Sequence, residues 1–410
     1  MKNDKKPQVR FKGFNDDWEQ RKLGEMGSTF TGLSGKTKED FGHGDAKFIT
    51  YMNVFSNPIA NLDMTEYVEI DSKQNCVKAG DVFFTTSSET PEEVGMSCVM
   101  SENADNIYLN SFCFGYRPTV EFDLNYLAYV LRAESFRKNM TFLAQGISRY
   151  NISKNKVMEI KISVPSLDEQ NLVGAYFSDL DHLITLHQRK CDKLQKIKKS
   201  MLEKMFPQSG MKKPEIRFKG FNDDWEQRKL SDVADVRDGT HASPKYISEG
   251  HPLVTSKNVK DGFVNYDDIQ YISDEDFDEI NKRSKVDVND VLIGMIGTIG
   301  NIALIRKEPD FAIKNVALIK DAKKINYLYI YHFLQSNSTI KQLTNSMDGG
   351  TQKFIALGNI RNLDIDIPSD QEQAKLGQYF ESLDNLITLH QRKLEKLKYI
   401  KKSMLENMFV

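Results

Sequence analysis

Cysteine is scarce in this chain, and the signatures of common enzymes are missing. The four cysteines form no CxxC pair and have no histidines at ligand spacing, so neither a zinc site nor a disulfide framework is indicated. The chain has no GxxxxGK[ST] phosphate loop, and the glycines of residues 294–300 do not have the spacing of a dinucleotide fingerprint. No set of nucleophile, histidine and acid recurs along the chain. The sequence therefore predicts no metal site, no cofactor in this chain and no catalytic centre.

Long apolar runs are missing too. The first ten residues lack the apolar core of a secretory signal, and the longest apolar run, residues 291–305, is interrupted by glycines. We expect no membrane span and a cytoplasmic protein. The 56 basic and 58 acidic residues leave a net charge of −2, so binding of nucleic acid would depend on local patches or on basic partners.

What the chain does contain is an internal repeat. The segment RFKGFNDDWEQRKL occupies residues 10–23 and recurs unchanged at residues 217–230. A second segment, LITLHQRK, occupies residues 183–190 and 386–393. Because both ends of the unit are duplicated while the residues between them differ, the chain consists of two copies of one unit with different inserts.

The repeat divides the chain into four segments. Each copy begins with a variable domain of ordinary size and ends in a helical spacer. A proline and a serine precede each spacer, and acidic residues follow in its first turn, as expected at a helix N-terminus. The predicted segments are the first variable domain (1–165), the first spacer (166–210), the second variable domain (211–368) and the second spacer (369–410).

Each spacer has key positions at alternating steps of three and four residues, which is typical of a coiled-coil seam. The matching registers predict that the two helices pack antiparallel, related by a pseudo-twofold axis. A helix of about 28 residues spans roughly 42 Å, so the pair would space the variable domains like a ruler. The predicted seam residues are Leu183, His187, Lys190, Leu194 and Ile197 in the first spacer, and Leu386, His390, Lys393, Leu397 and Ile400 in the second.

A histidine and a lysine interrupt each seam. Polar side chains in a seam can select the register and direction of pairing, because they reject misaligned partners. Alternatively, the seam rotates at this point and the polar side chains reach water. The sequence leaves both interpretations open.

The two inserts share a faint common pattern. Short β-rich runs followed by helical stretches indicate a mixed α/β domain in each. The expected fold class is therefore α+β or mixed, with two α/β domains joined by two long antiparallel coiled-coil helices. The matched segments are residues 50–54 with 255–259, 80–84 with 289–293, Asn110 with Asn315, 125–127 with 326–328, and 146–150 with 350–354.

These features together resemble the specificity subunit of type I restriction-modification systems. The resemblance covers nearly the whole chain. It rests on FKGFNDDWEQRKL before each insert, DGTHASPKY and LVTSKNV in the second insert, the [VI]PS…EQ helix start, and LITLHQRK with KKSMLE in both helices. It implies two target-recognition domains that each read half of a bipartite site in double-stranded DNA, with the helices setting the gap.

The resemblance also implies partners. Two modification subunits would dock on the helices and transfer methyl groups from S-adenosylmethionine to adenine. Restriction subunits would hydrolyse ATP, with Mg²⁺, to translocate and cut DNA. All these cofactors would belong to the partners, and this chain would be a non-catalytic subunit that contacts no membrane.

The candidate DNA contacts are mostly polar residues of the inserts. The loop at residues 238–246 carries donors, a cation and an aromatic ring, although it also has the composition of an ordinary polar turn. Asn53 and Asn258 could hydrogen-bond adenine or cap the local backbone. Arg149 and Lys353 follow a glycine and precede an aromatic residue, which favours close approach to DNA. The full set is Lys36, Lys38, Asn53, Ser87, Ser148, Arg149, Tyr150, Thr240, His241, Ser243, Lys245, Tyr246, Lys257, Asn258, Thr298, Gln352 and Lys353.

Two other classes of function remain open. A two-headed coiled-coil scaffold would bind proteins or glycans through its inserts, and apolar protein binding would not weaken steeply with salt as DNA binding does. A fused enzyme with an unrecognised site would cleave or methylate DNA as an isolated chain.

Overall fold

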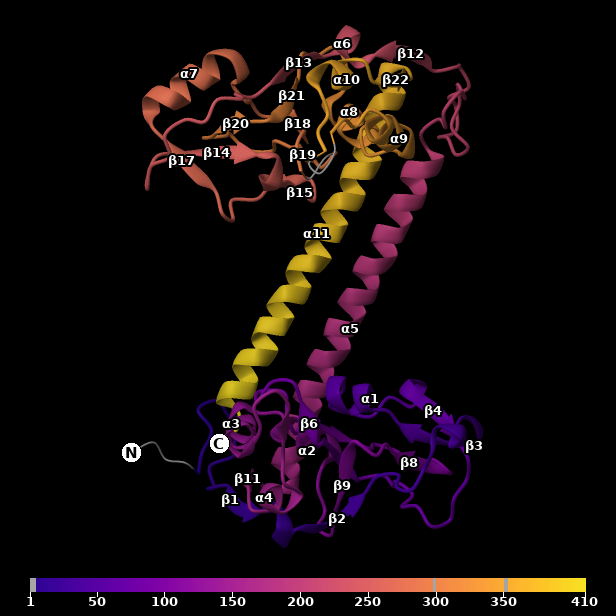
Figure 1. Ribbon diagram of the computed structural model, residues 1–410, viewed down its shortest axis with the longest axis vertical. Coiled ribbons are helices and arrows are strands. Elements are labelled where there is room, and N and C mark those ends of the chain that lie inside the picture. The colour runs from indigo at the N-terminus through magenta and orange to yellow at the C-terminus, as the bar shows by residue number, and fades with distance from the viewer. Residues whose placement is uncertain (1–4, 298–299, 350–352) are drawn as a thin grey trace. The chain divides into compact units, whose positions relative to one another are not determined.

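The structure is a computed structural model that describes residues 5–297, 300–349 and 353–410. It divides into two compact units, Met1–Gln188 with Arg392–Val410, and Arg189–Gln391. Each unit thus contains one variable domain, the start of one long helix and the end of the other (Figure 1). Among the described residues, no helix combines the length and apolar character that a membrane span requires.

The first unit is built on two small sheets. One is antiparallel with the order β2-β9-β5-β7, and the other has the order β4-β3-β8, in which β3 and β8 are parallel. The strands of these sheets are β2 (Gly27–Thr31), β9 (Cys113–Pro118), β5 (Val82–Thr85), β7 (Ser97–Val99), β4 (Thr65–Val68), β3 (Phe41–Ile49) and β8 (Ile107–Leu109). Two further antiparallel pairs are β1 (Glu19–Lys22) with β11 (Lys161–Val164) and β6 (Ser87–Ser88) with β10 (Tyr150–Asn151).

The second unit repeats this topology. Its antiparallel sheet has the order β13-β21-β18-β19, and its three-stranded sheet has the order β17-β14-β20 with β14 and β20 parallel. The strands are β13 (Asp235–Asp238), β21 (Val316–Lys320), β18 (Val291–Gly294), β19 (Ile302–Leu304), β17 (Gln270–Ile272), β14 (His251–Thr255) and β20 (Ala312–Lys314). The antiparallel pairs are β12 (Glu226–Lys229) with β22 (Asp364–Ile367) and β15 (Val259–Lys260) with β16 (Phe263–Val264).

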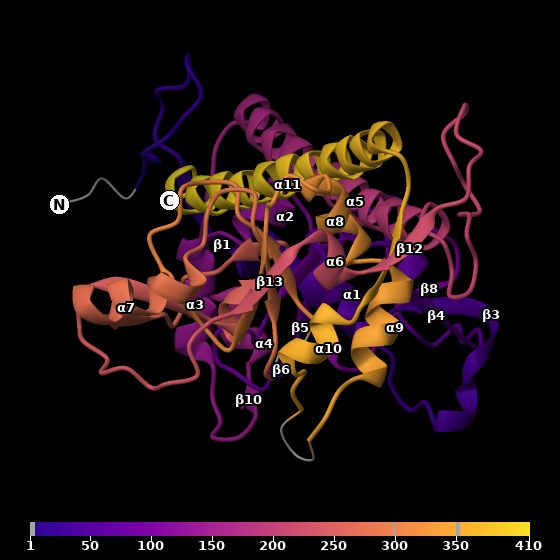
Figure 2. The ribbon, with the colours of Figure 1, turned by 90° about the horizontal axis from the view of Figure 1, so that it is seen from above.

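Short helices cover the sheets, and one long helix follows each domain. The second unit adds α7 at the edge of its domain, beside β20 and β13, as Figure 2 shows. The helices are α1 (Tyr51–Ser56), α2 (Leu124–Val130), α3 (Glu134–Leu143), α4 (Lys154–Met158), α5 (Leu167–Lys204), α6 (Leu230–Val233), α7 (Asp274–Ser284), α8 (Tyr327–Phe333), α9 (Asn337–Asn345), α10 (Leu357–Arg361) and α11 (Asp370–Asn407). The predicted mixed fold with two copies of one α/β domain is confirmed.

One matched segment was aligned wrongly in the sequence. Helix α2 begins after Asp123 and α8 after Asn326, and each of these side chains accepts backbone N–H bonds from its first helical turn. Asp123 therefore corresponds to Asn326, whereas the sequence match had paired residue 125 with residue 326. The identical letters Asn-Tyr-Leu were misleading, because aspartate and asparagine are equivalent as helix caps.

The match of residues 146–150 with 350–354 is wrong by one residue. Gln145 is bridged to Asn151 in the first unit, and Asp348 is bridged to Phe354 in the second. These two bridges share the offset of 203 residues that separates the LITLHQRK segments. Lys353 therefore occupies the place of Tyr150, and the position matching Arg149 lies outside the described residues.

The repeated entry segment ties each variable domain to the first turn of its long helix. Arg10 donates from Nε and Nη2 to the two carboxylate oxygens of Glu169 at 2.7 and 2.8 Å, and the Trp18 indole adds a bond at 3.1 Å. Arg217 makes the same two bonds to Glu372 at 2.7 and 2.8 Å. Both glutamates are 1% exposed. A buried carboxylate requires a paired, hydrogen-bonded cation, which accounts for the unchanged arginine.

Within the first unit, the end of α11 packs against the start of α5. Lys401 forms an ion pair with Asp181 at 2.6 Å. Just beyond the end of α11, Phe409 stacks on Phe177, which lies earlier on α5, with ring centroids 5.5 Å apart. The two helices are therefore antiparallel in this unit, as predicted.

The second unit has the same arrangement with the helices exchanged. Lys198 of α5 pairs with Asp384 of α11 at 2.7 Å, and Phe206 stacks on Phe380 with centroids 5.4 Å apart. Phe206 also contacts the rings of the second domain's core. Each domain thus completes its core with a phenylalanine from the end of the other copy's helix.

The predicted helix seam is wrong at four positions, which are all exposed: Leu183 (40%), Leu386 (44%), Lys190 and Lys393. Cys191 and Leu394 are buried instead of the two lysines. An α-helix has 3.6 residues per turn, so a strict heptad drifts around the helix, and the structure agrees with the interpretation in which the seam rotates at the polar pair. The other seam candidates are half-buried, namely His187, Leu194, Ile197, His390, Leu397 and Ile400.

Candidate nucleic-acid interface

In the first unit, three segments meet the residues that follow β5. Tyr51, at the start of α1, donates from its hydroxyl to the Ser87 carbonyl oxygen at 2.8 Å. Thr86 Oγ1 donates to the carbonyl oxygen of Phe112, in the turn between β8 and β9, at 2.8 Å. Arg149, in the 145–151 hairpin, donates from Nε to Ser87 Oγ at 3.2 Å. We call this convergence the first loop surface.

The second unit brings the equivalent segments together through Ser256. Its hydroxyl accepts bonds from the backbone N–H groups of Met295 and Ile296, at 3.0 and 3.2 Å, and donates to the Asn315 carbonyl oxygen at 2.7 Å. Ile296 is bridged to Phe354, which is itself bridged to Asp348. This second loop surface therefore lies at the same place in the fold as the first.

The exposed side chains of the two loop surfaces differ in chemistry. The first surface exposes Met52 (55%), Phe112 (59%) and Ile147 (95%). It also carries the exposed cation Arg149. Apolar side chains this exposed are costly in water unless they contact a partner, so this surface can make apolar contacts beside one cation.

The second loop surface is mainly polar and basic. Lys314 donates to Ser243 Oγ at 2.9 Å and lies 5.9 Å from the centre of the Tyr246 ring. Lys245, in the same loop as Ser243, and Lys353, next to Phe354, are exposed. The predicted residues Thr240, His241, Ser243, Lys245 and Tyr246 do occupy one loop, and Thr240 is bridged to Lys314. Such a set can contact phosphate and base edges.

His241 lies at the centre of this loop and bonds on both sides of its ring. Nδ1 is 2.7 Å from Asn315 Oδ1, and Nε2 is 2.9 Å from Asp238 Oδ2. These two hydrogen bonds, the one with Asn315 first, raise the pKa of His241 above its usual value. Arg283 binds the other oxygen of Asp238. His241 is therefore a positioning group for Asn315.

Four of the predicted DNA contacts are corrected by the structure. Asn53 and Asn258 are 0% and 2% exposed, and both ends of each side-chain amide are hydrogen-bonded to backbone groups of nearby residues. They are the local caps that the alternative interpretation described. Ser87 is 6% exposed, and Lys36 is held by Asp71 at 3.1 Å.

The remaining predicted residues differ in their surroundings. Lys257 donates to the Asp268 carbonyl oxygen at 2.8 Å, which directs its side chain along its own loop. Lys38 and Ser148 are exposed, and Tyr150 is half-buried in β10. Thr298 and Gln352 lie outside the described residues.

Sequence reasoning missed several residues of the loop surfaces. Asn315 had been matched to Asn110 but not proposed as a contact, and Lys314 was not singled out. Exposed apolar residues such as Phe112 and Ile147 gave no signal, because an apolar letter in a sequence normally indicates a core position. Their spacing from the glycine and asparagine of nearby turns was the only available clue.

A cluster of possible metal ligands lies in the second unit, below its loop surface. His332 is completely buried, 3.9 Å from a Glu381 oxygen and 4.0 Å from an Asp384 oxygen. Arg306 binds both oxygens of Glu381, and Lys198 binds Asp384. A divalent ion would therefore add charge beside two cations that already neutralise the carboxylates.

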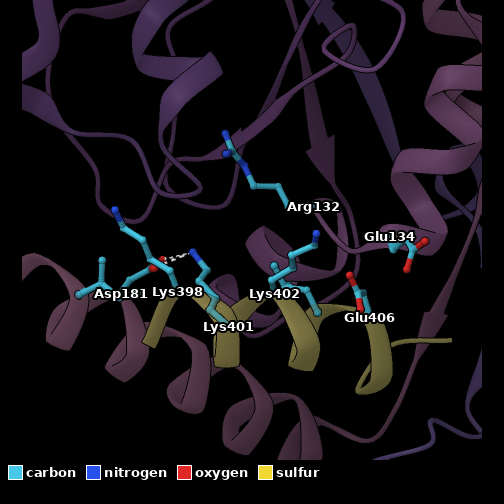
Figure 3. Close-up of a pocket in the computed structure, with 9 residues that line it drawn as sticks. Arg132, Glu134, Asp181, Lys398, Lys401, Lys402 and Glu406 are labelled. Carbon is cyan, nitrogen blue, oxygen red and sulfur yellow. Dashed lines mark hydrogen bonds and ion pairs between the residues drawn. The ribbon is translucent and has the colours of Figure 1, made fainter. Parts of the chain in front are cut away.

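The helices of the first unit carry a charged hollow of about 490 Å³. Figure 3 shows Lys401 directed at Asp181 across the hollow. Lys398 and Lys402 also line it, with Arg132 on the side of the variable domain. Ile184 and Leu405 add apolar side chains to this charged lining.

Comparisons with known proteins agree with this architecture. The chain matches the family described as type I restriction modification DNA specificity domain over residues 15–196 and 222–399. The MjaVIII specificity subunit of Methanocaldococcus jannaschii is 27% identical over 296 residues, 68% of each chain. The EcoKI specificity subunit of Escherichia coli is 23% identical over 319 residues, 74% of this chain and 67% of that protein.

A solved structure shares the fold. The crystal structure of the type I restriction-modification S subunit from M. genitalium has a TM-score of 0.60 and 15% sequence identity, over 99% of both chains. The family match covers most of both repeats, which confirms the resemblance found in the sequence. The chain therefore belongs to the family of type I restriction-modification DNA specificity subunits.

Proposed function

We propose that this chain is the non-catalytic subunit that gives a type I restriction-modification complex its DNA sequence specificity. Each loop surface contacts one half of a bipartite site. The observation that carries the proposal is a constant frame with two unlike loop surfaces at one place in the fold. A chain that must read two different half-sites in the same way needs this division of constant and variable parts.

The distribution of charge supports contact with DNA through local cations rather than through the net charge of the chain. The cations of the loop surfaces, such as Arg149, Lys314 and Lys353, contact phosphate or base edges in this proposal. A chain with a net charge of −2 binds DNA weakly by itself, so tight binding requires the partner subunits. Binding by the assembled complex falls steeply with salt, because phosphate contacts release counterions.

Two modification subunits dock on the long helices, one near each variable domain. The charged hollow in Figure 3 supports this step, because most of its helical lining recurs in the other copy at the offset of 203 residues, although Gln195 replaces Lys398. A repeated docking surface suits two copies of one partner. The recurring pairs are Asp181 with Asp384, Lys401 with Lys198, Lys402 with Lys199, and Glu406 with Glu203.

The chemistry belongs to the partners. Modification subunits supply S-adenosylmethionine and methylate adenine, and restriction subunits use ATP and Mg²⁺. The absence of recurring catalytic motifs in the sequence supports this assignment. The proposed place of action is the cytoplasm, where the complex meets chromosomal DNA.

The test is to co-express the chain with a modification subunit and to map methylated adenines across the host genome. We expect a single split motif with a fixed gap. Methylation that is random or missing would contradict the proposal. DNA methylation or cleavage by the purified chain alone would instead support the fused enzyme.

The spacing role has its own test. Lengthening α5 by four residues, about one helical turn, should change the gap of the motif and leave both half-sites unchanged. Altered half-sites with an unchanged gap would refute the ruler. The mapped motif of the unmodified chain provides the control.

A further inference from the structure

The turn between β20 and β21 fixes the backbone of Asn315 on the second loop surface. Asn315 has a φ of 54°, in the left-handed region that asparagine tolerates better than most residues. Its N–H donates to the Thr240 carbonyl oxygen at 3.1 Å, and its carbonyl oxygen accepts from Ser256 at 2.7 Å. These backbone bonds therefore fix the position from which the Asn315 side chain extends.

Three consecutive contacts then fix the rotation of the Asn315 amide. His241 Nδ1 lies 2.7 Å from Asn315 Oδ1, His241 Nε2 lies 2.9 Å from Asp238 Oδ2, and Arg283 binds Asp238. Asp238 is only 5% exposed, at the end of β13. The imidazole ring is thus attached to the sheet and cannot turn without breaking its partly buried bond to Asp238.

Both ring nitrogens of His241 face oxygen atoms, so both must carry a hydrogen. The imidazolium form has this arrangement, and the raised pKa of His241 favours it. Oδ1 of Asn315 is then occupied by the ring. Among the described residues, no acceptor is found for the Nδ2 amino group, which is the group left to face a ligand.

We propose that Asn315 reads one base pair of the second half-site as a hydrogen-bond donor, and that His241 is the positioning residue that orients its amide. The inference rests on the proposed function. In the major groove, guanine, adenine and thymine offer acceptors, whereas the edge of cytosine offers only a donor. The contacted base is therefore an acceptor-bearing base and not cytosine.

The first unit provides an internal contrast. Asn110 lies in the corresponding turn but is 5% exposed. Its Nδ2 donates to the Ile49 carbonyl oxygen at 3.0 Å, and its Oδ1 accepts from the Phe112 N–H at 2.9 Å. In the first domain, the asparagine of this turn thus hydrogen-bonds the backbone of its own domain. In the second domain, the amino group of the corresponding asparagine is left to face a ligand.

The central experiment removes the amide without straining the backbone. Asn315→Gly keeps the positive φ available, and the variant is co-expressed with the modification subunit for genome-wide mapping of methylated adenines. We expect discrimination at one position of one half-site to fall by about tenfold or more, with the other half-site unchanged. Asn362→Ala, at an exposed asparagine that ends α10, is the matched control and should leave the motif intact.

Variants of His241 test the positioning role. His241→Gln retains a side-chain N–H donor for Asn315 Oδ1 and should keep the motif. His241→Leu frees the amide to turn either oxygen or nitrogen outward, and it should relax the same single position as Asn315→Gly. Asn315→Asp offers only acceptors and should shift the preference there toward cytosine or adenine, whose edges carry donors.

The outcomes separate the inference from the proposed function. If the unchanged chain directs no split motif, the proposed function itself fails. If that motif exists and neither Asn315→Gly nor Asn315→Asp alters a single position, base reading by Asn315 is overturned. Base reading by Asn315 is also overturned if Asn315→Gly abolishes methylation at every site while its melting temperature stays that of the unchanged protein. If the glycine variant does not fold, the methylation motif of Asn315→Asp serves as the test.

Discussion

The turn after β8 and the turn after β20 occupy the same place in two copies of one fold, yet they present different chemistry. In the first unit the turn buries Asn110 and exposes Phe112. In the second unit Asn315 is half-buried, and His241 holds the oxygen of its amide. The comparison shows that the sheets determine where a loop surface lies, while the residues of one short turn determine what it can contact.

The largest expected effect concerns the core that each domain receives from the other copy's helix. Phe206→Ala and Phe409→Ala should each destabilise a unit by about 3–5 kcal/mol, because both remove a buried aromatic ring. Hydrogen exchange should show the loss in the second domain for Phe206→Ala and in the first for Phe409→Ala. Tyr399→Ala, at a 73% exposed position of α11, is the control that should change neither. Loss of protection in the opposite domains would contradict the exchange of helix ends.

The second prediction compares the two buried glutamates of the frame. Arg10→Leu and Arg217→Leu should each cost about 3 kcal/mol, because each leaves a carboxylate buried without its cation. The cost should be smaller for Arg10→Leu, since Trp18 still donates to Glu169, whereas the indole N–H of Trp225 has no hydrogen-bond acceptor among the residues that the structure describes. Denaturant unfolding of both variants measures the difference, and equal costs would show that the indole bond contributes nothing.

A third comparison concerns the residue that faces the aspartate of each helix. Tyr129 donates its hydroxyl to Asp181 at 2.8 Å, whereas the second unit has His332 at that place. Neither ring nitrogen of His332 has a hydrogen-bond partner in the described part of the chain, and burial lowers the pKa of this histidine. His332→Tyr should restore a hydrogen bond to Asp384 and stabilise the second unit by about 1 kcal/mol. A lower melting temperature for this variant would show that the ring does not fit.

The smallest expected effect is a pH dependence present in one unit only. Burial raises the pKa of Asp366 to about 6, while the first unit has Ser163 at this position. A raised carboxyl pKa means that the folded chain binds the proton more tightly than the unfolded chain. Its stabilising contribution is complete below the ordinary pKa of 3.8 and is lost as the pH rises through about 6.

Asp366→Ser should remove this part of the pH dependence and raise stability at neutral pH by about 1 kcal/mol, since the hydrogen bond from Gln227 offsets part of the cost of burial. Melting temperatures measured between about pH 4 and pH 8 provide the check. An unchanged slope in the variant would mean that Asp366 does not titrate in this window.

Much of the fold could be predicted from the sequence because duplication gives two independent readings of each element. The repeated entry segments and helices predicted the frame, and the offset of their letters predicted one fold for both inserts. The alignment of the two inserts failed where corresponding residues differ in type but have the same role. Asp123 and Asn326 are such a pair, because both cap the start of a helix.

The loop surfaces were harder to predict than the frame. Asn53 and Asn258 had the right residue type for reading bases, but the nearest unsatisfied backbone groups bind their side chains first. The side chain of Asn315 does not cap the backbone in this way, because His241, which is distant in sequence, binds its oxygen. Whether a polar residue reads a ligand or caps a turn depends on such long-range partners, which sequence spacing does not reveal.

The most direct test of the central claim is to exchange one variable domain while the frame stays constant. Residues 24–164 would be replaced by the corresponding insert of another specificity subunit, and methylated adenines would be mapped in cells that also produce the modification subunit. Our account predicts that one half of the split motif changes while the other half and the gap remain. A motif that changes in both halves, or in neither, would contradict it.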